Sequence, residues 1–176
     1  YQYSEATFLT DAGVSWGYSN RYGANATVNL GQSAWLAKPV SGVPVTTRAG
    51  LSGGIYTRND GYEYSVINRA VEEGHVGGYS RQFEAGTGGD LGQAAWVADW
   101  TPDGSGTSVV GFYDSGHTDS DGYQYSLVQD LNGAGYGSGY SERFGGGQSL
   151  GRAAWISAPG GSTTSAVGFT DAAHTR

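Results

Sequence analysis

Polar and apolar residues alternate along short stretches of this chain, and glycine-rich turns separate the stretches. In the middle third, residues 62–68 alternate, Glu73-Gly74 marks a turn, and residues 75–83 and 93–98 form two further runs. Runs of about six to eight residues bounded by turn residues are typical of β-strands. The pattern therefore predicts about twelve strands, the others being at 14–22, 32–37, 46–51, 108–113, 138–144, 152–157 and 166–170, with one at each Tyr-x-Tyr-Ser motif near 1–4 and 123–126.

The same short motifs recur along the chain. Gly17, Gly78 and Gly139 each begin a Gly-Tyr-Ser, at intervals of 61 residues. A Tyr-x-Tyr-Ser precedes each of them, and a Leu-Gly and an Ala-Trp follow. Self-similarity at a fixed period indicates one supersecondary unit copied along the chain. We therefore predict a single repeat domain, 1–176, made of three units at 1–60, 61–121 and 122–176.

Four predicted strands in each unit favour an all-β fold that resembles a β-propeller, whose blades are four-stranded sheets. A threefold β-trefoil or β-prism is the alternative, because such folds also arrange about twelve strands around an axis. Propellers have about four to eight blades. We therefore expect three units to form a partial ring that closes by oligomerisation, or to belong to a longer parent array.

A family resemblance rests on the middle unit. Its residues 65–68 and 73–80, followed by Ala94-Ala95-Trp96, resemble the HAF-type extracellular repeat of bacterial surface and secreted proteins. The third unit retains part of this pattern, whereas the first departs from it at Thr10-Asp11. The resemblance implies a propeller-like fold and an extracellular or cell-surface location in bacteria. It implies no activity and no catalytic residues.

Composition narrows the function classes. The net charge is −7 with only nine Lys and Arg residues, which opposes nucleic acid as a partner because phosphate binding needs local positive charge. No apolar run is long enough for a membrane-spanning helix. The chain has no Cys and no Met, so it offers no disulfide or thiol chemistry. A designed or consensus-derived repeat scaffold is also compatible with this composition.

Six aromatic residues at equivalent positions are predicted to form the structural core of the repeat. Each tryptophan follows a small residue, which leaves space for a large ring to pack inside. Exposed rings that stack on sugars are the alternative interpretation. The set comprises Tyr18, Tyr79 and Tyr140 with Trp35, Trp96 and Trp155.

A second set of equivalent positions is predicted to bind a ligand. In each unit, a polar side chain that can donate hydrogen bonds to hydroxyl groups stands beside an aromatic ring that can cover the C–H face of a polyol. Arginines that only bond loop carbonyls are the alternative. The pairs are Arg21 with Tyr22, Gln82 with Phe83, and Arg143 with Phe144. Tyr3, Tyr64 and Tyr125 join this set, because they alternate with Tyr1, Tyr62 and Tyr123 and one tyrosine of each pair should face outward.

Catalytic and metal sites are not predicted. The three histidines are scattered, and the carboxylates form no repeat-consistent pair of the kind that glycosidases use. Asp119-x-Asp121-Gly122 could begin a calcium loop, but no distal Glu follows, so we interpret it as a turn. We therefore expect a non-enzymatic, lectin-like recognition module that needs no cofactor and binds a glycan at repeat-equivalent sites. The alternative function is a self-assembling structural repeat, whose partner would be another copy of the chain.

Overall fold

The computed structural model describes residues 3–24, 26–101 and 106–169. Within these ranges the chain forms twelve β-strands and two short 3-10 helices, which confirms the prediction of an all-β fold. Three predictions fall partly outside the described residues. The first Tyr-x-Tyr-Ser motif and Tyr1 include residues 1–2, and the predicted strand 166–170 includes residue 170. The elements are β1 (Ser4–Leu9), β2 (Ser15–Tyr22), β3 (Asn29–Val40), β4 (Val43–Ala49), η1 (Gly54–Tyr56), β5 (Glu63–Ala70), β6 (His75–Phe83), β7 (Asp90–Asp99), β8 (Thr107–Val110), β9 (Gln124–Leu131), β10 (Gly137–Gly145), β11 (Gln148–Ser157), η2 (Pro159–Gly161) and β12 (Thr164–Val167).

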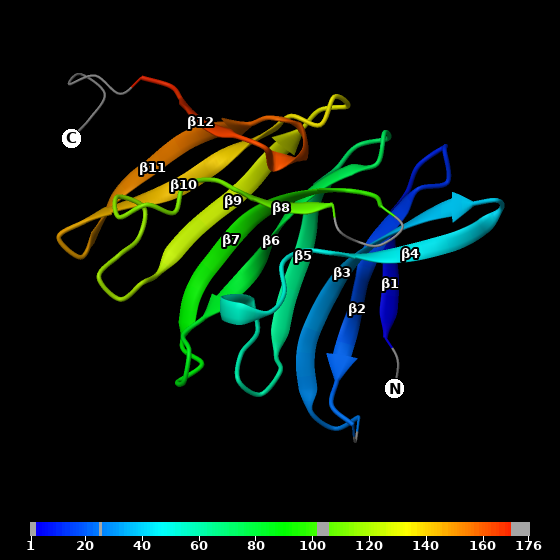
Figure 1. Cartoon of the computed structure of the whole chain (residues 1–176), viewed down its shortest axis with the longest axis horizontal. Coiled ribbons are helices and arrows are strands. Elements are labelled where there is room, and N and C mark those ends of the chain that lie inside the picture. The colour runs from blue at the N-terminus through cyan, green and yellow to red at the C-terminus, as the bar shows by residue number, and fades with distance from the viewer. Residues whose placement is uncertain (1–2, 25, 102–105, 170–176) are drawn as a thin grey trace.

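All twelve strands belong to one sheet (Figure 1). We call β1–β4 the first segment, β5–β8 the second and β9–β12 the third. Within each segment, consecutive strands pair antiparallel. A short parallel contact joins one segment to the next: β3 pairs with β5, and β7 pairs with β9. We call these contacts, with the packing around them, junction 1 and junction 2.

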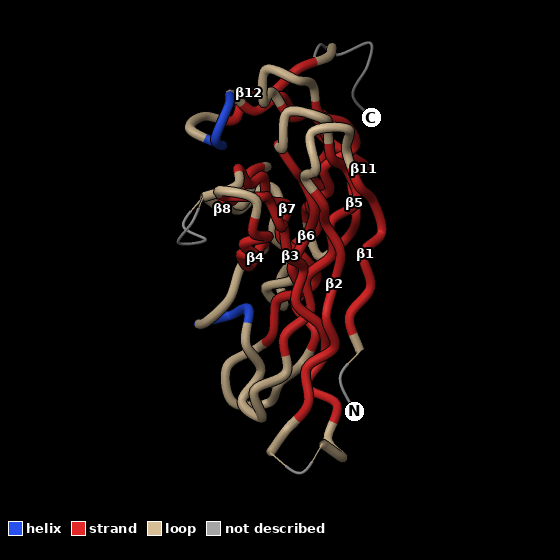
Figure 2. The backbone as a smooth tube through the Cα atoms, turned by 90° about the vertical axis from the view of Figure 1, so that its right-hand side faces the viewer, coloured by secondary structure: helices blue, strands red, loops and turns tan. Residues whose placement is uncertain are grey.

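The sheet is open. Its path begins at β1 and ends at β12, and Figure 1 places these strands at opposite ends of the molecule. Figure 2 shows β4 and β8 displaced to one side of the path that the other strands follow. The described strands therefore do not form a closed propeller by themselves, and closure of a partial ring by oligomerisation stays a prediction. Because each segment pairs only with its neighbours, nothing among the described residues brings β1 and β12 together into a closed ring.

Each junction depends on a glycine at the start of the third strand of its segment. Gly31 lies opposite Glu63 in the parallel register, with a φ of +88°, and a Cβ atom there would lie 1.9 Å from the Glu63 carbonyl oxygen. Gly92 has the same role opposite Gln124, with a φ of +89° and the same 1.9 Å approach. Only glycine combines this backbone conformation with so close a neighbour. The recurrent Leu-Gly motif therefore sets the approach of successive segments.

Apolar packing crosses both junctions. At junction 1, Ala34, Leu36 and Ala49 of the first segment pack with Trp96 and Val76 of the second. The corresponding cluster at junction 2 comprises Ala95, Val97 and Val110 from the second segment with Val128, Leu131 and Trp155 from the third. Each cluster therefore joins apolar side chains of two successive segments, an arrangement that is typical of repeat proteins.

A pair of serine hydroxyls lies beneath each junction. Ser65 Oγ and Ser80 Oγ are 2.7 Å apart and buried, and Ser80 Oγ accepts a hydrogen bond of 2.9 Å from Leu51 N. Gly50 leaves room for this pair, because a Cβ atom there would lie 2.6 Å from Ser65 Oγ. Junction 2 has the same arrangement, in which Gly111 and Phe112 cover the buried pair Ser126 and Ser141.

Candidate functional site

The three tryptophans differ in burial according to their neighbours. Trp96 and Trp155 are fully buried in the two junction clusters. Trp35 in the first segment is only half-buried, and neither apolar cluster includes it. The two buried rings, Trp96 and Trp155, therefore contribute to packing between segments.

The tyrosines form one contact in each segment. The ring centroids are 5.9 Å apart in the pair Tyr3–Tyr18, 6.4 Å in Tyr64–Tyr79 and 6.1 Å in Tyr125–Tyr140. Charged groups accompany these pairs. Glu5 accepts hydrogen bonds from Tyr3 and Tyr18, which lower the pKa of its carboxyl group, and the guanidinium groups of Arg81 and Arg152 lie 5.6 Å from the Tyr64 ring and 3.9 Å from the Tyr140 ring.

Arg21 and Gln82, which the sequence proposed as ligand-binding residues, lie at the junctions. Arg21 Nη1 is 2.7 Å from Glu63 Oε2 and donates a hydrogen bond of 3.1 Å to Gly61 O. Gln82 is 2% exposed and donates to Gln124 Oε1 at 3.4 Å. Tyr22 is half-buried, and Phe83 is buried edge-on against Tyr62. The donors of Arg21 and Gln82 are therefore engaged with the next segment.

Glu63 is the charged centre of junction 1. Its side chain is 7% exposed and pairs with both Arg21 and Arg48, and it accepts a hydrogen bond from Thr57. Burial raises the pKa of Glu63, but the hydrogen bonds from Thr57 and Arg48 and the two arginine charges outweigh it, so the pKa lies below the ordinary value. The ionised carboxylate therefore binds the first segment to the second.

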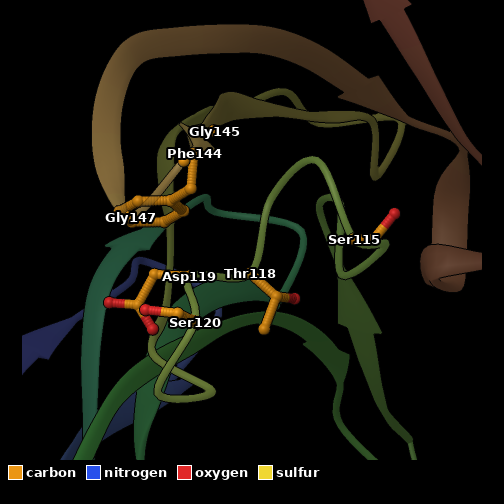
Figure 3. A pocket seen from close by; sticks show the side chains of 8 residues that line it. Ser115, Thr118, Asp119, Ser120, Phe144, Gly145 and Gly147 are labelled. Atoms are coloured by element: carbon orange, nitrogen blue, oxygen red, sulfur yellow. The ribbon is translucent and has the colours of Figure 1, made fainter.

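A pocket of about 590 Å³ opens in the third segment, beside Arg143 and Phe144. It lies between the loop that leads into β9 and the hairpin that joins β10 to β11 (Figure 3). In Figure 3 the Phe144 ring and the side chains of Asp119 and Ser120 lie on one side of the pocket, and Ser115 lies on the other. Its lining consists of Ser115, Thr118, Asp119, Ser120, Phe144, Gly145, Gly146 and Gly147.

Local hydrogen bonds hold the pocket residues in place. Asp119 Oδ1 accepts hydrogen bonds from Asp121 N at 2.9 Å and Tyr123 N at 2.8 Å, as expected for an aspartate that begins a turn. Phe144 N donates to Gly116 O at 2.9 Å, and the Phe144 ring packs edge-on against Tyr123 with centroids 6.2 Å apart. The carboxylate and the ring are therefore fixed before any ligand arrives.

The corresponding place in the second segment is filled by Arg58. Its Cγ and Cδ atoms lie 2.9 Å from the position that a Cβ atom of Gly88 would take. Its guanidinium group lies 4.6 Å from the Tyr62 ring and pairs with Asp60 at 2.6 Å, and it holds the pKa of that carboxyl group down at about 2. Asp119 and Arg58 occupy equivalent positions, because each lies two residues before the Asp-Gly of its loop. The shorter side chain of Asp119 leaves the pocket of the third segment open.

The three predicted ligand-binding pairs thus lie in different surroundings. Of the three polar partners, Arg143 of β10 is exposed, and its neighbour Phe144 lines the pocket. Asp119 and Ser120 were interpreted from the sequence as turn residues, and their place in a pocket was missed. The difference between Arg58 and Asp119 at equivalent positions was the signal that could have identified it.

Neither a metal-ligand cluster nor a membrane-spanning helix is present in the described part of the chain. Within it, no group of three or more His, Asp or Glu side chains is placed to hold a metal ion. None of the described helices is long and apolar enough to cross a membrane.

No family model matches the chain, and neither the curated proteins nor the solved structures give a match. The resemblance to HAF-type repeats therefore stays a prediction.

Proposed function

We propose that this chain is a non-enzymatic, extracellular recognition module that binds carbohydrate in the pocket of the third segment. The observation that carries the proposal is the fixed pair of an aromatic ring, Phe144, and a carboxylate, Asp119, on one side of an open pocket of about 590 Å³. A sugar offers both matching surfaces, because its C–H face can cover a ring while its hydroxyl groups donate to oxygen acceptors.

The pocket chemistry favours neutral or amino sugars over acidic ones. Side-chain oxygens of Asp119, Ser120 and Thr118 line it, and the chain carries a net charge of −7. An anionic ligand would meet a carboxylate in the pocket and an acidic protein around it. Hydroxyl and ammonium groups, in contrast, would donate to the Asp119 carboxylate in a charge-assisted hydrogen bond.

We also infer that the three segments are copies of one propeller-like unit. The same antiparallel order of strands and the same glycine-mediated junction support this inference. The pocket described above belongs to the third of these units, and we expect binding at one site per chain. The second copy is closed by Arg58, so equivalence of fold does not imply equivalence of binding.

Glycan binding can be tested with an array of neutral, amino and acidic saccharides, followed by calorimetric titration of the strongest neutral or amino-sugar hit. We expect one site per chain. Phe144→Ala should weaken binding about tenfold or more, and Asp119→Arg should abolish it by filling the pocket as Arg58 does. Tyr136→Ala, which removes an exposed ring from the same segment but outside the pocket, is the matched control and should leave affinity unchanged.

Two outcomes would contradict the proposal. An array without any hit would remove carbohydrate recognition. If Phe144→Ala retains full affinity while Tyr125→Ala loses it, binding takes place on the row of paired tyrosines instead. Both variants should be compared by circular dichroism, so that loss of binding is separated from loss of fold.

A further inference from the structure

The two ends of the sheet carry the two halves of the junction that occurs twice inside it. Each internal junction joins four features: a glycine with positive φ in the parallel contact, a glutamine amide bonded to the next segment, a glycine above a serine pair, and an apolar cluster. Gln32 Nε2 donates to Ser65 O at 3.1 Å, and Gln93 Nε2 donates to Ser126 O at the same distance. The junction is therefore a defined interface with two distinct faces.

The outer face of the first segment corresponds to the face that accepts a preceding segment. Ser4 Oγ and Ser19 Oγ are 2.7 Å apart, as are the buried pairs at both junctions, but Ser4 is exposed. Leu9 occupies the position of Leu131, and it is 67% exposed where Leu131 is 8% exposed. Trp35 is only half-buried. We call this surface, Ser4, Leu9, Ser19 and Trp35, the head face.

The outer face of the third segment corresponds to the face that covers a following segment. Gly151 has a φ of +95°, close to the values of +88° and +89° at Gly31 and Gly92. Unlike them, it has no described atom within 4 Å of the position that a Cβ atom would take. Gly168 likewise has a φ of +97° and no such neighbour, although its counterpart Gly50 lies against a serine pair. These glycines have the junction conformation without the junction partner.

The apolar side chains of the same face are exposed as well. Val167 is 44% exposed, whereas Val110 at the equivalent position in junction 2 is 1% exposed. Ile156 is 39% exposed, and its equivalent Val97 is 4% exposed. Ala154 is also exposed, although Ala95 is fully buried. We call this surface, Gly151, Ala154, Ile156, Val167 and Gly168, the tail face.

We propose that the tail face of one chain binds the head face of a second copy, and so forms an intermolecular junction like junctions 1 and 2. The occupant follows from continuity with those junctions, because the same chain already buries each of these surfaces against its complement twice. Such an interface is heterologous, so successive copies form a ring if the rotation closes and a filament if it does not. The proposal does not depend on carbohydrate binding.

Self-association can be measured by analytical ultracentrifugation of the chain from micromolar to millimolar concentration. We expect the average mass to rise with concentration beyond that of a dimer. Val167→Glu on the tail face and Leu9→Glu on the head face should each give a monomer, because a carboxylate would be buried without a partner. Val43→Glu changes a residue that is 64% exposed outside both faces, and it should assemble like the unmodified chain.

Mixing the two blocked variants gives the decisive result. A chain with a blocked tail retains its head, and a chain with a blocked head retains its tail, so an equimolar mixture should form a one-to-one dimer and nothing larger. A monomeric unmodified chain at all concentrations would overturn the proposal. So would a mixture that stays monomeric, or a blocked variant that still assembles. If circular dichroism shows that Val167→Glu or Leu9→Glu does not fold, Ile156→Glu on the tail face and Ser4→Glu on the head face are used instead.

Discussion

Junction 1 contains a charge cluster that junction 2 lacks, and this difference allows a specific stability prediction. Glu63 pairs with Arg21 and Arg48 across junction 1. At junction 2 the corresponding residues are neutral: Gln82 bonds Gln124, and Val109 lies opposite Trp96 as Arg48 lies opposite Trp35. Equivalent positions are therefore charged at junction 1 and neutral at junction 2.

Replacing Glu63 by Gln should destabilise the protein by about 2 kcal/mol. Removing one partner of a buried ion pair costs about 3–5 kcal/mol, because the other charge is left unpaired. Glu63 is 7% exposed, but Arg21 and Arg48 are 30% and 37% exposed, so water can partly hydrate the guanidinium groups and the cost is smaller. The free energy of unfolding is measured by urea denaturation at pH 7.

The triple variant Arg21→Gln, Arg48→Val, Glu63→Gln is the matched control, because it copies the neutral residues of junction 2. It should recover stability to within about 1 kcal/mol of the unmodified chain, since neutral replacement of a whole buried ion cluster is often tolerated. A Glu63→Gln variant as stable as the unmodified chain, or a triple variant no better than the single one, would refute this account of junction 1.

The effect of Glu63→Gln should also depend on pH. The pKa of Glu63 lies below its ordinary value of 4.5, so the ionised carboxylate contributes its full stability above about that pH. That contribution is lost as the pH falls through the lowered pKa in the folded protein. The stability difference between the unmodified chain and Glu63→Gln should therefore shrink in acid, and a difference that grows there would contradict the assignment.

Two further predictions compare positions inside a junction with equivalent positions at an end. Gly92→Ala should lower the unfolding midpoint far more than Gly151→Ala: both add strain of about 1–2 kcal/mol at positive φ, but only Gly92 would also drive a Cβ into Gln124 O. Equal shifts in thermal melts would contradict this. Trp96→Ala should cost about 3–5 kcal/mol in urea denaturation because the ring is fully buried, whereas Trp35→Ala should cost clearly less. The reverse order would show that the first segment does not end at an open face.

The positions of the strands could be predicted from the sequence because alternation and turn residues are local signals. The predicted run 75–83 coincides with β6, and the other predicted strands that lie in the described ranges overlap their counterparts. The extension of β3 to Val40 was missed, because Lys38, Pro39 and Val40 do not alternate and pair only through the hairpin with β4. Local pattern thus identifies strands better than their ends.

The arrangement of the segments could not be predicted, because it depends on contacts distant in sequence. The Leu-Gly motif was visible, but the reason for its glycine is the approach of the Glu63 carbonyl from another segment. Likewise, the sequence could not show that Arg21 pairs with Glu63, because the two residues belong to different segments. The pocket at Phe144 arises because two loops from different parts of the segment face each other, which no single stretch of sequence reveals.

The junctions between segments have a consequence for the order in which the molecule unfolds. The middle segment packs against a neighbour at both junctions, whereas each outer segment packs against a neighbour at one. In such a linear array, opening proceeds by nearest-neighbour steps from the extremities inward. The backbone amides of β5, β6 and β7 should accordingly exchange their hydrogens with solvent last, and fraying of an outer segment would leave the rest of the row intact.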